Sequence, residues 1–550
     1  MTERSSRVPE PVGAGVALIE AATPLVYRTN AFRVTGLPVD ATPRDVSRQL
    51  QKTAMLERLG HSAQGMSGPL ALNPAADGDA VRDAMQRLRD PERRLIEELF
   101  WFWPRRFGES SKDEALDAVN RGDLGTSTKI WVERAGTPSE AGVAIHNLAV
   151  LAHALALDYE YALGQGHTSR NLIDQRDRNW RPALERWVAL VGHEAFWARF
   201  AERIRTLDDP RLGGSTVRQI RTSLALAIVS ITARLALQAA ERGNSMETAR
   251  LVDLLHKSGF GREVVDEAFR SAIQPVRDRV RLMCESAAAE AMRVPGEGAN
   301  VARRLLEQAL PTVAILDRLL PAGDAMRDGA HDEVALRTEN SLAAYARETG
   351  NWKVIQEVHE FARRLAASPS ARQRLERSSE AITSNLLYSM CWFCKTNRAD
   401  DAAAVLVPMH GNVTRTPSKL INDLRVDPQL LGLSGTHVKW QQFTARVPRC
   451  TTCALAEKKT RALRNRGLVI GALAGIIGCV SLVDQSDEST GLGLLVAGAG
   501  AGVGALIGWL LGHSQEPAGM SPLTAKTEFP PIQERFKLGW AVGEKPSGVQ

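Results

Sequence analysis

Four cysteines carry the most specific chemical signal in the sequence. They form two Cys-x-x-Cys pairs, Cys391 with Cys394 and Cys450 with Cys453. Two thiolates at this spacing can face one ion from a tight turn, and two such turns complete a tetrahedral shell with zinc–sulfur distances of about 2.3 Å. Because four thiolates leave no open coordination position, the pattern predicts a structural Zn²⁺ and not a catalytic one.

The surroundings of the two pairs favour a small β module. The segments Ala404–Met409 and Gln442–Val447 are predicted to be short strands. Residues 389–456 therefore resemble a zinc ribbon, although the gap of about 55 residues between the pairs is longer than usual. A redox role is the alternative, but neither pair lies in a thioredoxin-like βαβ pattern. His410 and His437 are substitute ligands if one cysteine does not bind.

Two uncharged apolar segments, Gly467–Val483 and Gly491–Gly512, follow the second cysteine pair. Their lengths approach the roughly 20 residues that a helix needs to cross a bilayer, so residues 467–512 are predicted to form a transmembrane hairpin. Basic residues precede the first segment and acidic residues lie between the two. The positive-inside rule then places both termini in the cytoplasm, where thiols stay reduced. The basic residues are Lys458, Lys459, Arg461, Arg464 and Arg466, and the acidic ones are Asp484, Asp487 and Glu488.

Glycines recur every four residues along both apolar segments. Small residues at this spacing let two helix backbones approach closely in lipid. The hairpin is therefore predicted to pack on itself, with oligomerisation, a pore or a buried soluble hairpin as alternatives. The helix-packing glycines are Gly467, Gly471 and Gly475 in the first segment and Gly500, Gly504, Gly508 and Gly512 in the second.

Residues 112–388 show long runs of helical periodicity without strand-like alternation, and glycine or proline falls between the runs. They are predicted to form an α-solenoid or a stack of helical hairpins. Residues 146–162 and 341–367 loosely resemble tetratricopeptide repeats, a family that binds protein segments on a concave face. The predicted helices are Val143–Ala162, Arg181–Phe200, Thr216–Glu241, Glu247–Lys257, Val264–Met292, Ala299–Leu320, His331–Glu348 and Lys353–Ala366.

Residues 28–106 form a separate helical pattern, with helices predicted over Arg44–Leu59 and Asp79–Trp103. The opening NAFRVTGLPVDATPRDV and the closing AMQRLRDPERRLIEE resemble the corresponding segments of a J domain. That family stimulates ATP hydrolysis by a seventy-kilodalton chaperone through a His-Pro-Asp tripeptide. Here His61 is followed by serine and alanine. The resemblance therefore implies a J-like helical fold without the co-chaperone activity.

Other residues that could do chemistry lack a supporting motif. The aromatic run Phe100–Trp103 is predicted to be core shared with the following helices, and a docking surface is the alternative. Cys284 is predicted to be a small buried hydrophobe. No metalloprotease, nucleophile-elbow or phosphate-loop motif accompanies the histidines, so we expect no enzyme. The histidines, predicted to be core or surface residues, are His146, His153, His193, His256, His331 and His359.

Composition bounds the remaining possibilities. The chain has 550 residues, of which 44% are hydrophobic and 24% charged, which excludes wholesale disorder. A net charge of +6 over this length gives no strong case for a nucleic-acid partner. Residues 1–27 are predicted to be disordered. The tail, residues 513–550, is predicted either to pack on the zinc module through Phe536 and Trp540 or to stay disordered with one docking helix.

These observations predict a mainly α protein with a J-like module, a helical stack, a small zinc-bound β module and a two-pass transmembrane hairpin. The leading hypothesis is a membrane-anchored cytoplasmic scaffold that recruits protein partners through its helical region and contacts membrane lipid. A membrane-perturbing effector whose hairpins form homo-oligomers is one alternative. A degenerate J-domain co-chaperone is the other.

Overall fold

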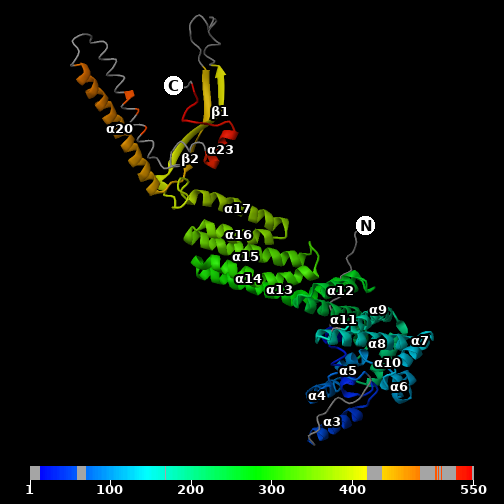
Figure 1. Cartoon of the computed structure of the whole chain (residues 1–550). Coiled ribbons are helices and arrows are strands. Elements are labelled where there is room, and N and C mark those ends of the chain that lie inside the picture. The colour runs from blue at the N-terminus through cyan, green and yellow to red at the C-terminus, as the bar shows by residue number, and fades with distance from the viewer. Residues whose placement is uncertain are drawn as a thin grey trace. The chain divides into compact units, whose positions relative to one another are not determined.

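A computed structural model describes residues 13–58, 70–167, 169–417, 436–483, 502–503, 506, 510 and 528–547. Over these residues the chain is mainly helical with one small antiparallel sheet, as predicted (Figure 1). It divides into two compact units. The first comprises the chain up to Ser286 together with Leu305–Val334, and the second comprises Ala287–Arg304 together with the chain from Ala335 onward.

Helices build the first unit, and many of them begin at a residue whose side chain accepts a hydrogen bond from the first turn. Asp77, Asp123 and Ser169 cap three of them in this way. The helices are α1 (Ala14–Ala21), α2 (Ala31–Thr35), α3 (Pro43–Arg58), α4 (Gly78–Arg87), α5 (Pro91–Leu99), α6 (Glu114–Asn120), α7 (Leu124–Ala135), α8 (Ala141–Gly164), α9 (Arg170–Val191), α10 (Glu194–Leu207), α11 (Gly214–Glu241) and α12 (Ser245–His256).

Two central helices of this unit each contain a long apolar stretch. Within the described residues, α8 and α11 are long and apolar enough to cross a membrane, with mean hydropathies of 1.4 and 1.6. However, 78% of the apolar window of each helix is buried inside the protein. A helix with such a stretch belongs either to a membrane or to a core, and this burial shows that α8 and α11 form the core of the first unit.

The aromatic run Phe100–Trp103 lies in the same core, which confirms the core prediction and excludes a docking surface. The four side chains are at most 3% exposed. Trp103 stacks on Phe200 of α10, with ring centroids 5.9 Å apart. The Asn147 side chain of α8 pairs with the Trp103 backbone through two hydrogen bonds of 2.8 Å. The core of residues 28–106 is thus shared with the helices that follow.

Two helices predicted to be continuous are interrupted. The prediction of one helix over Asp79–Trp103 is wrong, because α4 ends at Arg87 and α5 begins at Pro91. Proline has no N–H to donate to the preceding turn, and the Asp90 side chain caps the new helix. The prediction of one helix over Arg181–Phe200 is also wrong, because α9 ends within this range and a new helix, α10, follows. The ring nitrogen of His193 accepts a hydrogen bond from the first turn of α10 and so caps it.

The prediction of a disordered segment over residues 1–27 is also wrong for its described part. Residues 14–21 form α1, in which Leu18 is fully buried. The helix packs against α11 at Gly15, where a Cβ atom would lie 3.2 Å from the Gln219 carbonyl oxygen. This contact joins residues about 200 positions apart, so no local sequence pattern announces it.

Long helices also lead into the second unit. Four of them match predicted helices, although one begins at Ala325 and not at His331, and the helix Pro369–Ser389 was not among those predicted. A small core of alanines and Leu375 joins α15, α16 and α17. The resemblance to tetratricopeptide repeats stays a prediction. The helices are α13 (Arg262–Arg293), α14 (Gly298–Leu319), α15 (Ala325–Thr349), α16 (Trp352–Leu365) and α17 (Pro369–Ser389), and short 3₁₀ turns lie at Ser110–Lys112, Pro295–Glu297 and Asp401–Ala403.

The sheet of the second unit has the strand order β2-β1-β3. Strands β1 (Val405–Pro417) and β2 (Thr436–Val447) pair antiparallel, with Val405 opposite Val447 and Met409 opposite Phe443. Both are longer than the predicted segments Ala404–Met409 and Gln442–Val447. Strand β3 (Ala541–Val542) comes from the tail and pairs with β1 at Met409 and His410.

The tail docks on this sheet through helix α23 (Pro530–Lys537) and the residues on either side of it. Phe529 and Ile532 are fully buried in the core of the sheet, together with Val407 and Val447. Of the two residues predicted to dock, Trp540 is buried, whereas Phe536 is 38% exposed. The docked tail is therefore confirmed, but two of its anchors were not foreseen.

Helix α20 (Thr451–Val483) starts beside the sheet and contains the whole first apolar segment, including Gly467, Gly471 and Gly475. Within this apolar segment, the side chains that the structure describes are all more than half exposed, namely those of Val469, Ile470, Leu473 and Ile477. The second apolar segment, with Gly500, Gly504, Gly508 and Gly512, lies outside the described residues except at positions 502, 503, 506 and 510. Packing of the two segments through their glycines stays a prediction.

Candidate metal centre

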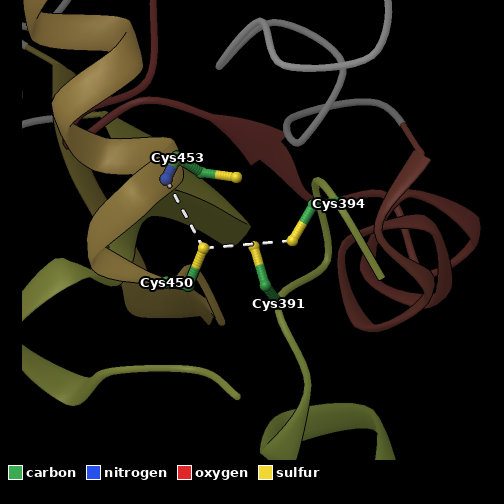
Figure 2. Close-up of side chains that lie close together, drawn as sticks. All are labelled: Cys391, Cys394, Cys450 and Cys453. Atoms are coloured by element: carbon green, nitrogen blue, oxygen red, sulfur yellow. Dashed lines mark hydrogen bonds between the residues drawn. The ribbon is translucent and has the colours of Figure 1, made fainter. Parts of the chain in front are cut away.

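The structure brings the four predicted cysteines together. Their sulfur atoms all lie within 4.8 Å of one another, and the sulfurs of Cys394 and Cys450 are 3.9 Å apart. Figure 2 shows Cys391 and Cys394 on one loop and Cys450 and Cys453 at the start of α20. Sulfurs at the corners of a tetrahedron with bonds of about 2.3 Å are separated by about 3.8 Å. The cluster therefore has the size of a four-thiolate metal site.

The first pair lies on a tight turn between α17 and β1. The N–H of Lys395 donates to the Cys391 carbonyl at 2.8 Å, and the N–H of Cys391 donates to the Asn397 carbonyl at 2.9 Å. Lys395 adopts a left-handed backbone conformation with φ of 56°. This reversal of the chain directs both sulfurs of the pair to the same side, and the Asn397 amide donates to the Cys450 sulfur at 3.6 Å.

The second pair occupies the first turn of α20. Cys450 precedes the helix, and the N–H of Cys453 donates to its sulfur at 3.4 Å, as to an N-cap side chain. A helix N-terminus favours negative charge, so this position stabilises a thiolate. The loop of the first pair is joined to the segment before α20, because the N–H of Trp392 donates to the Pro448 carbonyl at 2.9 Å.

The four thiols of the cluster differ in pKa. Burial raises the pKa of Cys394, but hydrogen bonds from residues 396–397 outweigh it and lower the pKa to about 6. The Cys450 pKa is also lowered, because the hydrogen bond from the Cys453 N–H outweighs burial. Burial raises the pKa of Cys391, and burial together with the neighbouring thiols raises that of Cys453. A divalent cation at the centre of the cluster would favour the thiolate form of all four cysteines.

None of the four cysteines forms a disulfide. The separation of 3.9 Å between Cys394 and Cys450 is far from the ~2.0 Å of a sulfur–sulfur bond. Convergence of two pairs from two elements on one point is typical of a metal site, not of a redox Cys-x-x-Cys. The arrangement can hold an ion and leaves it no position for substrate.

The substitute ligands are not needed. The ring of His410 points to the tail, where its Nδ1–H donates to the Gly543 carbonyl at 3.0 Å. The His437 side chain lies outside the described residues. Cys284 is fully buried on α13, as predicted. Of the other histidines, four are at least 90% buried, namely His146, His153, His331 and His359, and the described residues show them in no cluster of metal ligands.

Aromatic side chains connect the cysteine cluster to the sheet and the tail through direct contacts. Trp392, inside the first pair, contacts Phe529 edge to face, with ring centroids 5.3 Å apart. The Arg449 guanidinium lies over the Phe393 ring at 6.0 Å and donates to the Ala403 carbonyl at 2.7 Å. Sequence reasoning missed these contacts. The two large aromatic residues between the cysteines of the first pair, Trp392 and Phe393, were the feature of the sequence that indicated packing of this loop against a core.

No protein family, no curated protein and no solved structure matches this chain.

Proposed function

We propose that this chain is a membrane-anchored cytoplasmic scaffold, in which a structural Zn²⁺ fixes a helical part to a two-pass membrane hairpin. One observation carries the proposal. Helix α20 starts directly after Cys450, contains Cys453 and runs without interruption through the first apolar segment. The tail that follows the second apolar segment packs on the sheet beside the same cysteines.

This connection supports a two-pass topology. Residues 484–527 lie in the sequence between the end of α20 and the segment that contains Phe529, which is buried and contacts Trp392 beside the first cysteine pair. The chain segments before and after the apolar region therefore both belong to the small module formed by the sheet and the cysteine cluster. A chain that starts and ends at the same module crosses a bilayer an even number of times. The basic residues before Gly467 favour the cytoplasmic side of the membrane for that module.

The metal would make the anchor rigid. Cys453 lies in the first turn of α20, and Gly467 follows it by 14 residues, which corresponds to about 21 Å of helix. Lys458, Lys459 and Arg466 are exposed on this stretch. Exposed lysine and arginine next to a membrane span attract anionic lipid headgroups, at about 1 kcal/mol each. A centre of four thiolates, one on α20 and one directly before it, would hold this helix in a fixed direction relative to the sheet.

Zinc is the ion that best fits the donor set. Four thiolates in a small tetrahedral cluster suit Zn²⁺ or an iron site, and Zn²⁺ has no redox chemistry that a purely structural centre would have to control. The helical part would supply the surfaces for protein partners, as helical stacks commonly do.

Membrane extraction of full-length protein tests the proposal. We expect the protein to sediment with membranes after lysis and to stay there in alkaline carbonate. A variant with Leu473→Arg and Ile477→Arg should be released, because a charged side chain at the centre of a span costs about 2.5–3.5 kcal/mol. Leu455→Arg is the matched control, since Leu455 is 58% exposed on the same helix before the basic residues.

Full-length protein in the supernatant without detergent would overturn the anchor and the scaffold together. Release of dye from liposomes on insertion would favour the membrane-perturbing alternative.

A further inference from the structure

A cavity of about 320 Å³ lies in the first unit, away from the cysteine cluster. Its wall is formed by the segment after the aromatic run, the end of α7, the start of α8 and the start of α10. Binding pockets for small molecules begin at about 300 Å³, so the cavity can hold a compact ligand.

Guanidinium groups dominate the wall. Four arginines line the cavity against one carboxylate, that of Glu140: Arg105, Arg106, Arg134 and Arg199. Arg105 pairs with Glu140, and Arg134 is held by Asp113 at 2.9 Å. Within the described part of the chain, Arg106 has no ion-pair partner. Arg199 pairs with Glu202 at 3.0 Å, so the positive charge that no ion pair offsets in this wall is that of Arg106.

Two helix N-termini meet at the same place. Gly142 and Val143 of α8 line the cavity, as does Ala195 of α10. First-turn N–H groups have no acceptor inside their own helix, and these three donate to no other group among the described residues. Gly142 permits the approach, because a Cβ atom there would lie 3.0 Å from the Phe196 nitrogen. Helix N-termini attract anions through their free N–H groups and their dipoles.

A buried donor without a partner lies in the same wall. Trp131 lines the cavity and is 1% exposed, and its indole N–H has no hydrogen-bond partner among the described residues. Buried donors in native proteins nearly always have an acceptor. The indole N–H itself is closed off from solvent, so the groups of this wall that lack an anionic partner and can reach a ligand are Arg106 and the first-turn N–H groups of α8 and α10.

We propose that this cavity binds a compact phosphorylated ligand, with Arg106, Arg199 and the first-turn N–H groups of α8 and α10 around the phosphoryl oxygens. A phosphate monoester has three terminal oxygens and a charge of about −2, so it can accept from two arginines and from helix N–H groups at once, whereas a carboxylate has two oxygens and chloride has no fixed geometry. This site is separate from the membrane anchor, so either inference can fail without the other.

Calorimetric titration of the full-length protein in a nonionic detergent tests this site, with ionic strength held constant by sodium chloride. Inorganic pyrophosphate represents free phosphate compounds. Dihexanoyl phosphatidic acid, below its critical micelle concentration, represents a lipid headgroup. We expect saturable binding of at least one probe, and the probe that binds more tightly identifies the source of the ligand.

Variants make the test specific. Ala195→Glu places a carboxylate at the mouth, at a helix position where an acidic residue is well tolerated, and should abolish binding without unfolding the protein. The double variant Arg106→Gln, Arg199→Gln should weaken binding at least tenfold. Arg121→Gln removes one exposed charge of the same unit outside the cavity and should bind as the unaltered protein does. No saturable binding of either probe, or equal binding by Ala195→Glu, would overturn the proposal.

Discussion

The indole ring of Trp540 lies directly against the backbone of Gly411. A Cβ atom on Gly411 would be 2.6 Å from Cε2 of that ring, closer than real atoms approach. Trp540 also contacts Phe443 edge to face, with the Arg535 guanidinium 4.8 Å from its ring. The Trp540 ring therefore packs on β1 in the space that a side chain at position 411 would occupy.

Replacing Gly411 with valine should displace the tail. The added side chain overlaps with the indole ring, and overpacking of this kind costs about 1–3 kcal/mol. Trypsin should then cleave full-length protein near Arg535 and Lys537 faster than it cleaves the unaltered chain. Leu538→Ala is the control, because Leu538 is 69% exposed and its replacement leaves the contact between Trp540 and Gly411 unchanged. Equal cleavage of the Gly411→Val variant would show that the tail does not depend on this contact.

The sequence predicts what local patterns encode. Cys-x-x-Cys spacing, helical periodicity and the two strand segments are all local, and the structure contains them. The docking of Phe529 and Ile532 is not local, because it joins residues separated by more than 80 positions. The arginines of the cavity span about 95 positions and look like ordinary surface charges until the fold collects them. The break at Asp90–Pro91, in contrast, carried a readable signal, since aspartate followed by proline is typical of a helix start.

The metal centre predicts a definite metal content. Purified full-length protein should contain about one zinc ion per chain, measured by mass spectrometry of the metal. Cys453→Ala should lose it, because three thiolates no longer close the tetrahedral shell and the first turn of α20 is released. Cys284→Ala is the matched control, as its cysteine is buried on α13, outside the cluster. Retention of zinc by the Cys453→Ala variant would exclude this cysteine as a ligand.

Buried histidines should make the first unit sensitive to acid. Burial lowers the pKa of His146 to about 4 and that of His153 to about 3, from an ordinary value near 6.5. The Trp187 indole N–H donates to Nδ1 of His153 at 3.2 Å, which requires that nitrogen to be unprotonated. Below about pH 6.5 the unfolded chain binds these protons and the folded chain does not, so stability falls as pH falls, by up to about 1.4 kcal/mol per pH unit for each histidine.

Thermal unfolding of full-length protein between about pH 7 and pH 5 measures this slope. Glu97 and Glu160 act in the opposite sense at lower pH, because burial raises their pKa values. His153→Leu should reduce the slope, whatever its effect on stability at neutral pH. His167→Ala alters an exposed side chain and should leave the slope unchanged. An unchanged slope in the His153→Leu variant would contradict the assignment.

Glu98 should be among the most sensitive positions of the first unit. It is fully buried, and its carboxylate accepts hydrogen bonds from Arg94 at 2.9 Å and from Arg203 of α10 at 2.7 Å. Arg94 also donates to the carbonyls of Val39 and Ala41, so one carboxylate joins three segments. Removing one partner of a buried ion pair leaves an uncompensated charge and costs about 3–5 kcal/mol.

Glu98→Ala should therefore lower the free energy of unfolding by about this amount, measured by tryptophan fluorescence in urea. Glu133→Ala, on the exposed side of α7, should change it by less than about 0.5 kcal/mol. Because Arg203 lies outside residues 28–106, the same contact predicts that a fragment ending at residue 106 does not fold alone. A folded fragment, or a loss below about 1 kcal/mol in Glu98→Ala, would show that the J-like segment is stable without its neighbours.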